Sequence, residues 1–380
     1  MNARVPDVAI VGAGIVGAAC AHELAARGLH VTVIDRAGIG TGTTAAGMGH
    51  LVVMDDSPAE FALSAYSRAL WLALAPRLDA RHAFVKCGTL WVAADDEEFV
   101  LAQTRQQALQ AQGIACHMLD AGQVREAEPE LRDGLAGGMV VPDDAVVYAP
   151  TVAAWLLAQP VAGRIDTRLA NEVVALERDG VRLADGSAIA AGAVLLANGI
   201  QAPELLPGLP LQAKKGHLLI TDRYPGMVRH QILELGYIKS AHHQSGTSVA
   251  FNVQPRPTGQ LLIGSSRQFD SLDPAIDQAV LARMLRRAAE YLPNLPALQA
   301  IRAWTGFRPA SSDGLPLIGP AALDAPHPAT WLALGHEGLG VTTALGTAQL
   351  IAAQMLGTPA PLDAAPYLPA RFAGPGAAHA

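Results

Sequence analysis

The chain has little of several features that mark other classes of protein. Only three cysteines, Cys20, Cys87 and Cys116, occur among 380 residues, and none of them forms a CxxC pair. Their spacing argues against a disulfide framework and against a zinc site, so we expect no metal centre. The chain has no basic block and a formal net charge of −7, which disfavours nucleic acid as a partner.

Membrane and secretory features are equally scarce. Although 51% of the residues are hydrophobic, no uncharged apolar run of about 18 residues stands out, so we expect no membrane span. An apolar strand begins almost directly after Met1, which leaves no room for the charged and apolar regions of a secretory signal. We therefore expect a cytoplasmic protein, long enough for two lobes with substantial cores.

The first 36 residues contain the most informative pattern. An apolar run, Val8–Val11, leads into the turn Gly12-Ala13-Gly14-Ile15-Val16-Gly17 and a helical stretch to Arg27-Gly28. A second apolar run, Val31–Ile34, ends in Asp35. This order predicts a dinucleotide-binding unit of strand, glycine turn, helix, strand and acid. A glycine turn of some other α/β protein is disfavoured, because the strand, helix, spacing and acid all match.

Each residue of the turn has a physical task in such a unit. Gly12 permits the tight turn, Gly14 lets the backbone approach the pyrophosphate, and Gly17 lets the helix pack closely on the sheet. The start of the helix offers free N–H groups and the positive end of its dipole to the phosphates. Asp35 is placed to accept hydrogen bonds from the ribose hydroxyls.

A second glycine-rich turn follows more than 300 residues later. The apolar strand Trp331–Leu334 runs into Gly335-His336-Glu337-Gly338-Leu339-Gly340 and then a helix to about Met355. NAD needs one such turn, whereas a flavin dinucleotide needs a separate element for its ring. Free N–H groups at the start of this helix would stabilise negative charge on a reduced flavin. The two turns together favour FAD over the alternative of a simple helix with glycine at its start.

The middle of the chain predicts a second lobe. Runs typical of antiparallel strands occur at 217–221, 237–239, 249–253 and 261–264. Before them, a meander at 172–176, 181–183 and 193–197 ends in Ala197-Asn198-Gly199, where small residues leave room for a nucleotide.

Three shorter segments complete the prediction. The loop 41–50 consists of small residues that can follow a cofactor closely. Residues 58–75 have helical periodicity, with the buried side expected at Phe61, Ala65, Leu72 and Ala75. The chain after Pro359 is rich in alanine and proline and is expected to be a frayed terminus.

Taken together, these motifs resemble the FAD-dependent amine and amino-acid oxidoreductases, the family of glycine oxidase, D-amino acid oxidase and dehydrogenase, and monomeric sarcosine oxidase. The likeness is carried by GAGIVG with Asp35, by LLANG, by WTGFRP and SDGLPLIGP, and by GHEGLG. It covers roughly residues 6 to 357. Within the family, GMGHLVVMDD and GHEGLGVTTALGTA most resemble the D-hydroxyproline dehydrogenases.

The resemblance implies an α/β fold with an α+β substrate lobe. A Rossmann-like FAD-binding domain would comprise residues 1–85, 145–210 and 300–370. A mainly antiparallel β substrate domain would comprise 86–144 and 211–299, and 371–380 would form a flexible tail.

The resemblance also assigns site residues. Arg308 in GFRP matches the family arginine that binds the substrate carboxylate, and a guanidinium can donate two parallel hydrogen bonds to that group. A surface salt bridge, or stacking of Arg308 on Trp304, is the alternative. Tyr237 resembles a tyrosine at the polar end of the substrate, with a core aromatic as its alternative. His50 is a further candidate, although a solvent-facing loop histidine is the favoured interpretation.

The candidate cofactor residues come from the two turns and the segments near them. They are Gly12, Gly14, Ile15, Val16, Gly17, Asp35, Arg36, Thr43, Thr44, Ala45, Ala46, Gly47, Val174, Ala197, Asn198, Gly199, Gly306, Gly335, His336, Glu337, Gly338, Leu339, Gly340, Val341 and Thr342. His336 is assigned to the flavin environment through its place in GHEGLG.

Two departures from the family pattern refine this picture. Sarcosine oxidases attach FAD to a cysteine near the region of Arg308, and this stretch has none, so FAD is expected to be noncovalent. Glycine oxidase has a second arginine where Glu337 and Gly338 stand here, which counts against glycine as substrate.

The expected reaction is the one that the resemblance implies. Hydride would pass from the α-carbon of a D-amino acid to flavin N5, with cis-4-hydroxy-D-proline giving a cyclic imino acid as the sharpest prediction. No convincing base stands out in the sequence. A glycine, sarcosine or general D-amino acid oxidase using oxygen remains an alternative, as do a FAD-carrying subunit of an electron-transfer complex and a nicotinamide-dependent dehydrogenase. The acceptor (oxygen, a quinone or a partner subunit) and a homo- or hetero-oligomeric state stay open.

Overall fold

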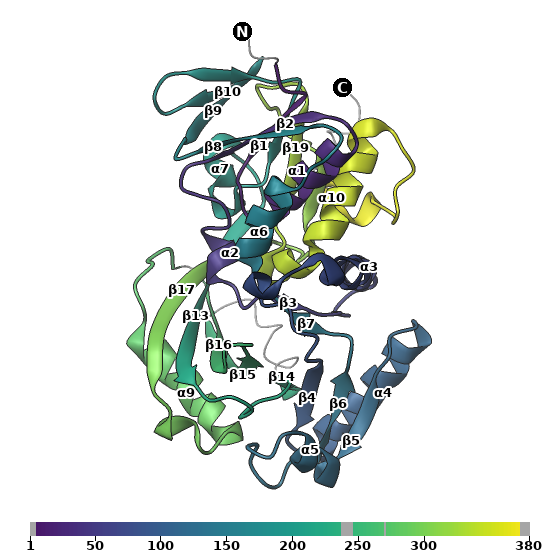
Figure 1. Cartoon of the computed structure of the whole chain (residues 1–380), viewed down its shortest axis with the longest axis vertical. Helices are drawn as coiled ribbons and strands as arrows, with labels where there is room; N and C mark the ends of the chain where they lie inside the picture. Colours follow the sequence, from purple (N-terminus) through teal and green to yellow (C-terminus); the bar gives the residue numbers. More distant parts are fainter. Residues whose placement is uncertain (1–4, 237–245, 270, 373–380) are drawn as a thin grey trace.

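The computed structural model describes residues 5–236, 246–269 and 271–372. It has two lobes, each built on its own sheet (Figure 1). The predicted mixed α/β fold, with a Rossmann-like part and a mainly antiparallel part, is confirmed.

The first lobe holds the dinucleotide-type sheet. Its six strands lie in the order β18 (Leu317–Pro320), β19 (Thr330–Leu334), β12 (Ala193–Leu196), β1 (Val8–Val11), β2 (His30–Asp35) and β8 (Arg164–Leu169). All neighbours pair in parallel except β18, which is antiparallel to β19. Nearly every residue of the central strands β1, β12 and β2 is buried, as expected for a parallel sheet with both faces covered.

Helices and smaller sheets complete this lobe. The helices are α1 (Ile15–Ala26), α2 (Thr43–Ala46), α3 (Pro58–Leu74), α6 (Ala149–Ala158), α7 (Ala202–Leu205) and α10 (Gly340–Leu356). Short 3-10 turns are η1 (Ala75–Arg77), η2 (Ala80–His82), η3 (Gly199–Gln201), η5 (Glu337–Leu339), η6 (Ala365–Tyr367) and η7 (Pro369–Phe372). The small sheets are β9 (Val173–Glu177), β10 (Gly180–Leu183) and β11 (Ala188–Ala190), and β3 (His50–Leu51) with β7 (Ala145–Val146).

The second lobe is an eight-stranded sheet. Its order is β17 (Ala300–Ser311), β13 (Leu211–Arg223), β16 (Gln260–Gln268), β15 (Thr247–Pro255), β14 (Gln231–Glu234), β4 (Thr89–Ala93), β6 (Gly137–Val141) and β5 (His117–Asp120). Only β14 and β4 pair in parallel. Its helical segments are α4 (Asp96–Ala111), α5 (Ala121–Ala127), α9 (Gln278–Tyr291) and η4 (Leu295–Ala297).

Strand pairing differs from the sequence analysis in two places. The third strand of the predicted meander, β12, lies in the parallel sheet between β1 and β19, and the meander instead closes with β11. β17 falls in the range expected for the FAD-binding domain, yet it pairs along its length with β13. The domain ranges themselves stay a prediction.

Helix α3 buries a different face from the one predicted. The buried side chains are Leu63, Ser64, Ser67, Arg68 and Trp71, whereas those of Phe61, Ala65, Leu72 and Ala75 are only partly buried. The reason is close contact with α10: Ser67 Oγ accepts a hydrogen bond from the Gly346 N–H at 3.0 Å. A Cβ at Gly346 would stand 3.0 Å from Leu63, so the helices meet through small residues rather than an apolar stripe.

Residues Glu337–Leu356 are long and apolar enough to cross a membrane by length and composition alone, a stretch that the sequence analysis did not single out. In the fold this stretch is a core element between α1 and α3. The Trp71 indole N–H lies 3.0 Å from the Val341 carbonyl oxygen, and about half of the stretch is buried.

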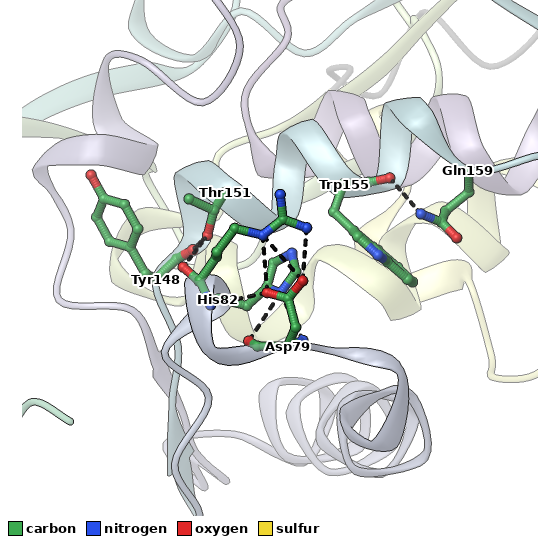
Figure 2. Close-up of polar contacts among 7 residues, drawn as sticks. Asp79, His82, Tyr148, Thr151, Trp155 and Gln159 are labelled. Carbon is green, nitrogen blue, oxygen red and sulfur yellow. Dashed lines mark hydrogen bonds and ion pairs between the residues drawn. The ribbon is translucent and has the colours of Figure 1, made fainter.

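The link from α3 to β4 is fixed to the start of α6 (Figure 2). The buried His82 ring packs edge-on against Trp155 at 6.0 Å between centroids, and the Tyr148 N–H donates to the His82 carbonyl oxygen at 2.7 Å. Thr151 Oγ1 donates to the Tyr148 carbonyl oxygen, and Asp79 caps η2. These contacts hold the start of α6 against the link between α3 and β4.

The frayed terminus expected after Pro359 is wrong for the residues described through Phe372. Tyr367 is 1% exposed, and its hydroxyl donates to the Ala59 carbonyl oxygen at 2.6 Å. Arg371, which was assigned to the flexible tail, pairs with Asp313 at 2.7 Å. Two side-chain anchors therefore hold a segment that lacks apolar periodicity.

Candidate active site

A cavity of about 710 Å³ lies between the two lobes. The first lobe contributes the starts of α1 and α10, the segment 43–60 and the end of β12. The second lobe contributes one face of the eight-stranded sheet. Because side chains alternate along a strand, this face presents every second residue of β14, β13 and β17: Gln231 and Leu233, then Lys214, Gly216 and Leu218, then Gly306 and Arg308.

The front glycine turn is built as the sequence predicts. Gly12 has a φ of 112°, and a Cβ there would stand 2.6 Å from the Ala197 carbonyl oxygen. A Cβ at Gly17 would stand 2.0 Å from the Gly12 carbonyl oxygen, so α1 can approach the turn only with glycine there. The N-cap residue Gly14 offers no side-chain cap, although Thr44 Oγ1 accepts the Ile15 N–H at 3.1 Å, and Gly14, Ile15 and Val16 line the cavity. Such a start binds phosphate groups.

Asp35 helps to hold this turn. Its Oδ2 accepts the Ala13 N–H and its Oδ1 accepts the Ala37 N–H, each at 2.8 Å. Each carboxylate oxygen can accept a second hydrogen bond, and the side chain is partly exposed, so a ribose contact is compatible with this geometry. Nη1 of the neighbouring Arg36 lies 3.8 Å from Oε1 of Glu172.

The rear turn closes the other end of the cavity. Gly335 has a φ of 75°, and η5 leads into α10, which starts without a side-chain cap. His336 is buried, with Nε2 3.0 Å from Thr347 Oγ1. Burial lowers the pKa of His336 to about 4, so its ring is neutral beside the open N–H groups of α10.

Arg308 reaches into the cavity from β17. Its side chain passes over Gly216 of β13, and Nη1 donates to the Ser266 carbonyl oxygen of β16 at 3.1 Å. Its Cδ lies close to Gly338 of the rear turn. The stacking on Trp304 is wrong as an account of Arg308, because it is Arg302 that lies over that ring, and Arg308 lines the cavity.

His50 is not the solvent-facing loop histidine that the sequence favours. It stands on β3 and lines the cavity, with Nε2 3.0 Å from the Gly338 carbonyl oxygen, so Nε2 carries a proton and donates. Burial first, and then the charges of Arg308 and Arg256, lower the pKa of His50 to about 4. His50 is therefore neutral at physiological pH. Tyr237 lies outside the described residues.

Comparisons with known proteins agree with this geometry. Residues 7–354 match the model of the family described as FAD dependent oxidoreductase. The chain belongs to this FAD-dependent oxidoreductase family. It is 30% identical to a glycine oxidase of Pseudomonas aeruginosa, over 96% of this chain and 98% of the relative.

Solved structures add two similar folds. The glycine oxidase from Geobacillus kaustophilus is 28% identical with a TM-score of 0.84, and the match covers 96% of this chain and 98% of that chain. An L-proline dehydrogenase from P. horikoshii has a TM-score of 0.82 over 97% of this chain and 98% of that chain. At 21% identity the second match shows the fold alone. The protein is thus a FAD-dependent oxidoreductase.

The residues present fit FAD. The starts of α1 and α10 face the same cavity, and the front turn has contacts into which a Cβ would not fit. The predicted cofactor residues that line the cavity are Gly14, Ile15, Val16, Thr43, Thr44, Ala46, Gly47, Ala197, Gly199, Gly306, Gly335, His336, Glu337, Gly338, Leu339, Gly340 and Val341. Those outside the lining are Gly12, Gly17, Asp35, Arg36, Ala45, Val174, Asn198 and Thr342. None of the three cysteines is among the described residues that line it, and noncovalent attachment of FAD stays a prediction.

Two cations near the rear turn were missed by the sequence analysis. Lys214 Nζ lies 3.1 Å from one oxygen of Glu337, and Arg267 Nη2 lies 3.7 Å from the other. Burial opposes ionisation of Glu337, but the charges of Arg267, Lys214 and Arg308 outweigh it and lower the pKa of that carboxyl. Glu337 is therefore an ionised cavity carboxylate with a φ of 47°.

Glu60 is a second cavity carboxyl that the sequence analysis missed. It follows the cap of α3, and its Oε2 accepts the Asp56 N–H at 3.1 Å. Burial and the nearby charge of Asp56 raise the pKa of Glu60 to about 7. In the sequence, Ser57 and Glu60 form an S-x-x-E capping pattern. This pattern indicates the start of a helix and gives no indication that Glu60 lies in a cavity.

Proposed function

We propose that this protein oxidises a D-amino acid, most closely a proline-like one such as cis-4-hydroxy-D-proline, to the corresponding cyclic imino acid. The observation that carries the proposal is the position of Arg308. A guanidinium in a cavity lined by both glycine turns can hold a carboxylate and thereby orient the adjacent carbon. When bound, FAD supplies a hydride acceptor for the C–H bond next to the amine.

The chain's own residues then perform three tasks. Arg308 fixes the substrate carboxylate, and the neutral His50 ring donates to the Gly338 carbonyl oxygen and so braces the rear turn. Glu337 pairs with Lys214 and Arg267, and the charge of Arg308 also acts on this carboxylate, so Glu337 keeps the cations of the rear turn close together. Oxidation also requires a neutral amine, and Glu60 is a cavity carboxyl whose raised pKa suits a proton acceptor near neutral pH.

The test is anaerobic reduction of the flavin in the purified yellow protein by a panel of D- and L-amino acids. The proposal expects bleaching of the flavin absorbance by cis-4-hydroxy-D-proline or D-proline at lower concentrations than by glycine or sarcosine. Bleaching by L-amino acids alone would contradict it. Admission of air then separates an oxidase, which reoxidises at once, from a dehydrogenase.

A second candidate is oxidation of glycine with oxygen as acceptor. The similarity to glycine oxidases favours it. Against it, Glu337 and Gly338 occupy the turn where the resemblance expects an arginine. Rapid bleaching by glycine followed by rapid reoxidation in air would establish this candidate instead.

A further inference from the structure

The backbone ladder between β13 and β16 is interrupted beside Arg308. Its register shifts between Lys215 and Leu219, where residues 216–218 of β13 lie opposite residues 264–267 of β16. Strand β16 therefore carries one extra residue, as in a β-bulge, and the pairing of backbone N–H and carbonyl groups is disturbed locally. Bulges are common beside active sites, where they change the direction of a nearby group.

Within this bulge, Ser266 makes hydrogen bonds through both its side chain and its backbone. Its Oγ accepts the His217 backbone N–H at 2.9 Å and so takes the place of a backbone acceptor in the ladder. Its carbonyl oxygen accepts a hydrogen bond from Nη1 of Arg308 at 3.1 Å. Ser266 is 1% exposed and is not among the described residues that line the cavity, so its influence on a substrate passes through Arg308.

The His217 ring fixes the Ser266 hydroxyl from the face of the sheet opposite the cavity. Gly216 and Leu218 line the cavity, so the intervening His217 points to the other face, where α9 packs (Figure 1). His217 Nε2 accepts the Asp277 N–H at 3.0 Å and is therefore the unprotonated nitrogen, because a backbone N–H only donates. Nδ1 of the neutral ring then carries the proton and donates to Ser266 Oγ at 2.9 Å.

The surroundings of His217 keep its ring neutral and in place. The residue is completely buried. Burial first, and then the charge of Lys215, lower the pKa of His217, and the Asp277 carboxylate offsets this only in part. Asp277 itself caps the start of α9 with its side chain. A continuous series of hydrogen bonds thus runs from the start of α9 through His217 and Ser266 to Arg308.

We propose that Ser266 is a positioning residue for the substrate-binding arginine. Its hydroxyl, held by His217, fixes the backbone at the bulge, and its carbonyl oxygen sets the direction of the Arg308 guanidinium. Without the hydroxyl, two N–H donors of His217 lose this acceptor and the carbonyl oxygen is no longer held, so carboxylates should bind more weakly. The inference rests on the proposed function, because it takes Arg308 as the partner of the substrate carboxylate.

A second irregularity in the same strand pair supplies a matched control. The register shifts again where Thr221 Oγ1 accepts the Leu261 N–H at 3.0 Å. Thr221 is 2% exposed and pairs with Ala300, at the opposite end of β17 from Arg308. Thr221→Val and Ser266→Ala each remove a hydroxyl that accepts a buried backbone N–H. Both variants should therefore lower the Tm by similar amounts.

The test measures the Kd of pyrrole-2-carboxylate from its perturbation of the flavin spectrum in the purified yellow protein. Ser266→Ala is expected to retain FAD and to raise this Kd roughly tenfold, because the guanidinium is no longer aligned with the carboxylate. His217→Phe removes the ring donor but keeps the backbone N–H and should raise the Kd by a smaller factor. Thr221→Val should keep the Kd of the parent. An unchanged Kd in Ser266→Ala, an equal rise in Thr221→Val, or loss of FAD from Ser266→Ala overturns the inference.

A double-mutant cycle shows whether Ser266 acts through Arg308. The rate of anaerobic flavin reduction is measured at a low, subsaturating concentration of the amino acid that bleaches the parent most readily. Ser266→Ala should lower this rate roughly tenfold in the parent but leave it unchanged in the Arg308→Ala background. An equal decrease in both backgrounds indicates a general structural role and overturns the inference.

Failure of the proposed function gives a different result. Equal binding of pyrrole-2-carboxylate to the parent and to Arg308→Ala rejects Arg308 as the carboxylate partner, and with it both proposals. Weak binding to Arg308→Ala together with unchanged binding to Ser266→Ala rejects only the inference about Ser266.

Discussion

The guanidinium of Arg308 fills the space that a side chain at Gly216 would occupy. A Cβ added at residue 216 would stand 2.8 Å from Nη2 and 2.9 Å from Nη1 of Arg308. The two residues belong to adjacent strands, and Gly216 pairs with Gly306, two residues before Arg308. The path of the arginine across the sheet therefore depends on the absence of a side chain on β13.

We expect Gly216→Ala to displace Arg308 without unfolding the protein, because the contacted atoms are the end of a flexible side chain. The variant should bind FAD normally and raise the KM for its amino acid roughly tenfold or more. Steady-state kinetics with the flavin absorbance as control measures both properties. An unchanged KM would show that substrate binding does not depend on the position of the Arg308 side chain over residue 216.

Removal of the guanidinium should have a larger effect. Arg308→Ala is expected to retain the yellow colour and to raise the substrate concentration required by orders of magnitude, because a charge-assisted bidentate contact is lost. Arg308→Lys restores the charge but not the two parallel donors and should recover only part of the loss. If Arg308→Ala reduces its flavin as readily as the parent, the carboxylate binds elsewhere.

Glu60 makes stability depend on pH in a defined direction. Its pKa of about 7 lies above the ordinary value of 4.5, so the folded protein binds more protons than the unfolded chain between these values. Stability should then fall as pH rises from about 4.5 to about 7, by at most roughly 3 kcal/mol.

The variant Glu60→Gln removes this dependence. The Tm of the variant minus the Tm of the parent should therefore be larger at pH 8 than at pH 5. A Tm difference that is the same at both pH values would contradict a raised pKa at this carboxyl.

His50 should not titrate in the working pH range. With a pKa of about 4, its ring stays neutral above pH 6. The position of any inflection in kcat/KM between pH 6 and 9 should therefore be the same in the parent and in His50→Gln, whatever the rate. An inflection near pH 6.5 that is present only in the parent would identify His50 as the titrating group.

The C-terminal segment should contribute to stability. Tyr367→Phe removes the hydroxyl that donates to the Ala59 carbonyl oxygen and should lower the free energy of unfolding by about 1 kcal/mol. Deletion of residues 360–380 should lower the Tm further, because the buried Tyr367 ring is lost as well. A truncated chain with the parent Tm would restore the interpretation of a frayed end.

Local motifs explain why part of this structure could be predicted from sequence. Gly12, Gly17 and Asp35 act within one contiguous unit, and their spacing reports their contacts directly. Arg308 could be assigned because its neighbours resemble a family motif. The second turn at Gly335–Gly340 was likewise visible as a strand that runs into glycine and then a helix.

The remaining features depend on strand pairing and helix contacts that the sequence does not display. Lys214, Asn252 and Arg267 face the cavity only because β13, β15 and β16 lie side by side, and a one-residue change of register would turn them away. The buried face of α3 was misassigned because Ser67 contacts α10 through a hydrogen bond rather than through apolar surface.

The most direct test of the account is a crystal structure of the yellow protein with pyrrole-2-carboxylate. We predict that the phosphates lie at the start of α1, that the flavin ring lies beside the turn at Gly338 and the start of α10, and that the ligand carboxylate lies on Arg308. A flavin ring bound away from the rear turn, or a carboxylate with no contact to Arg308, would contradict it.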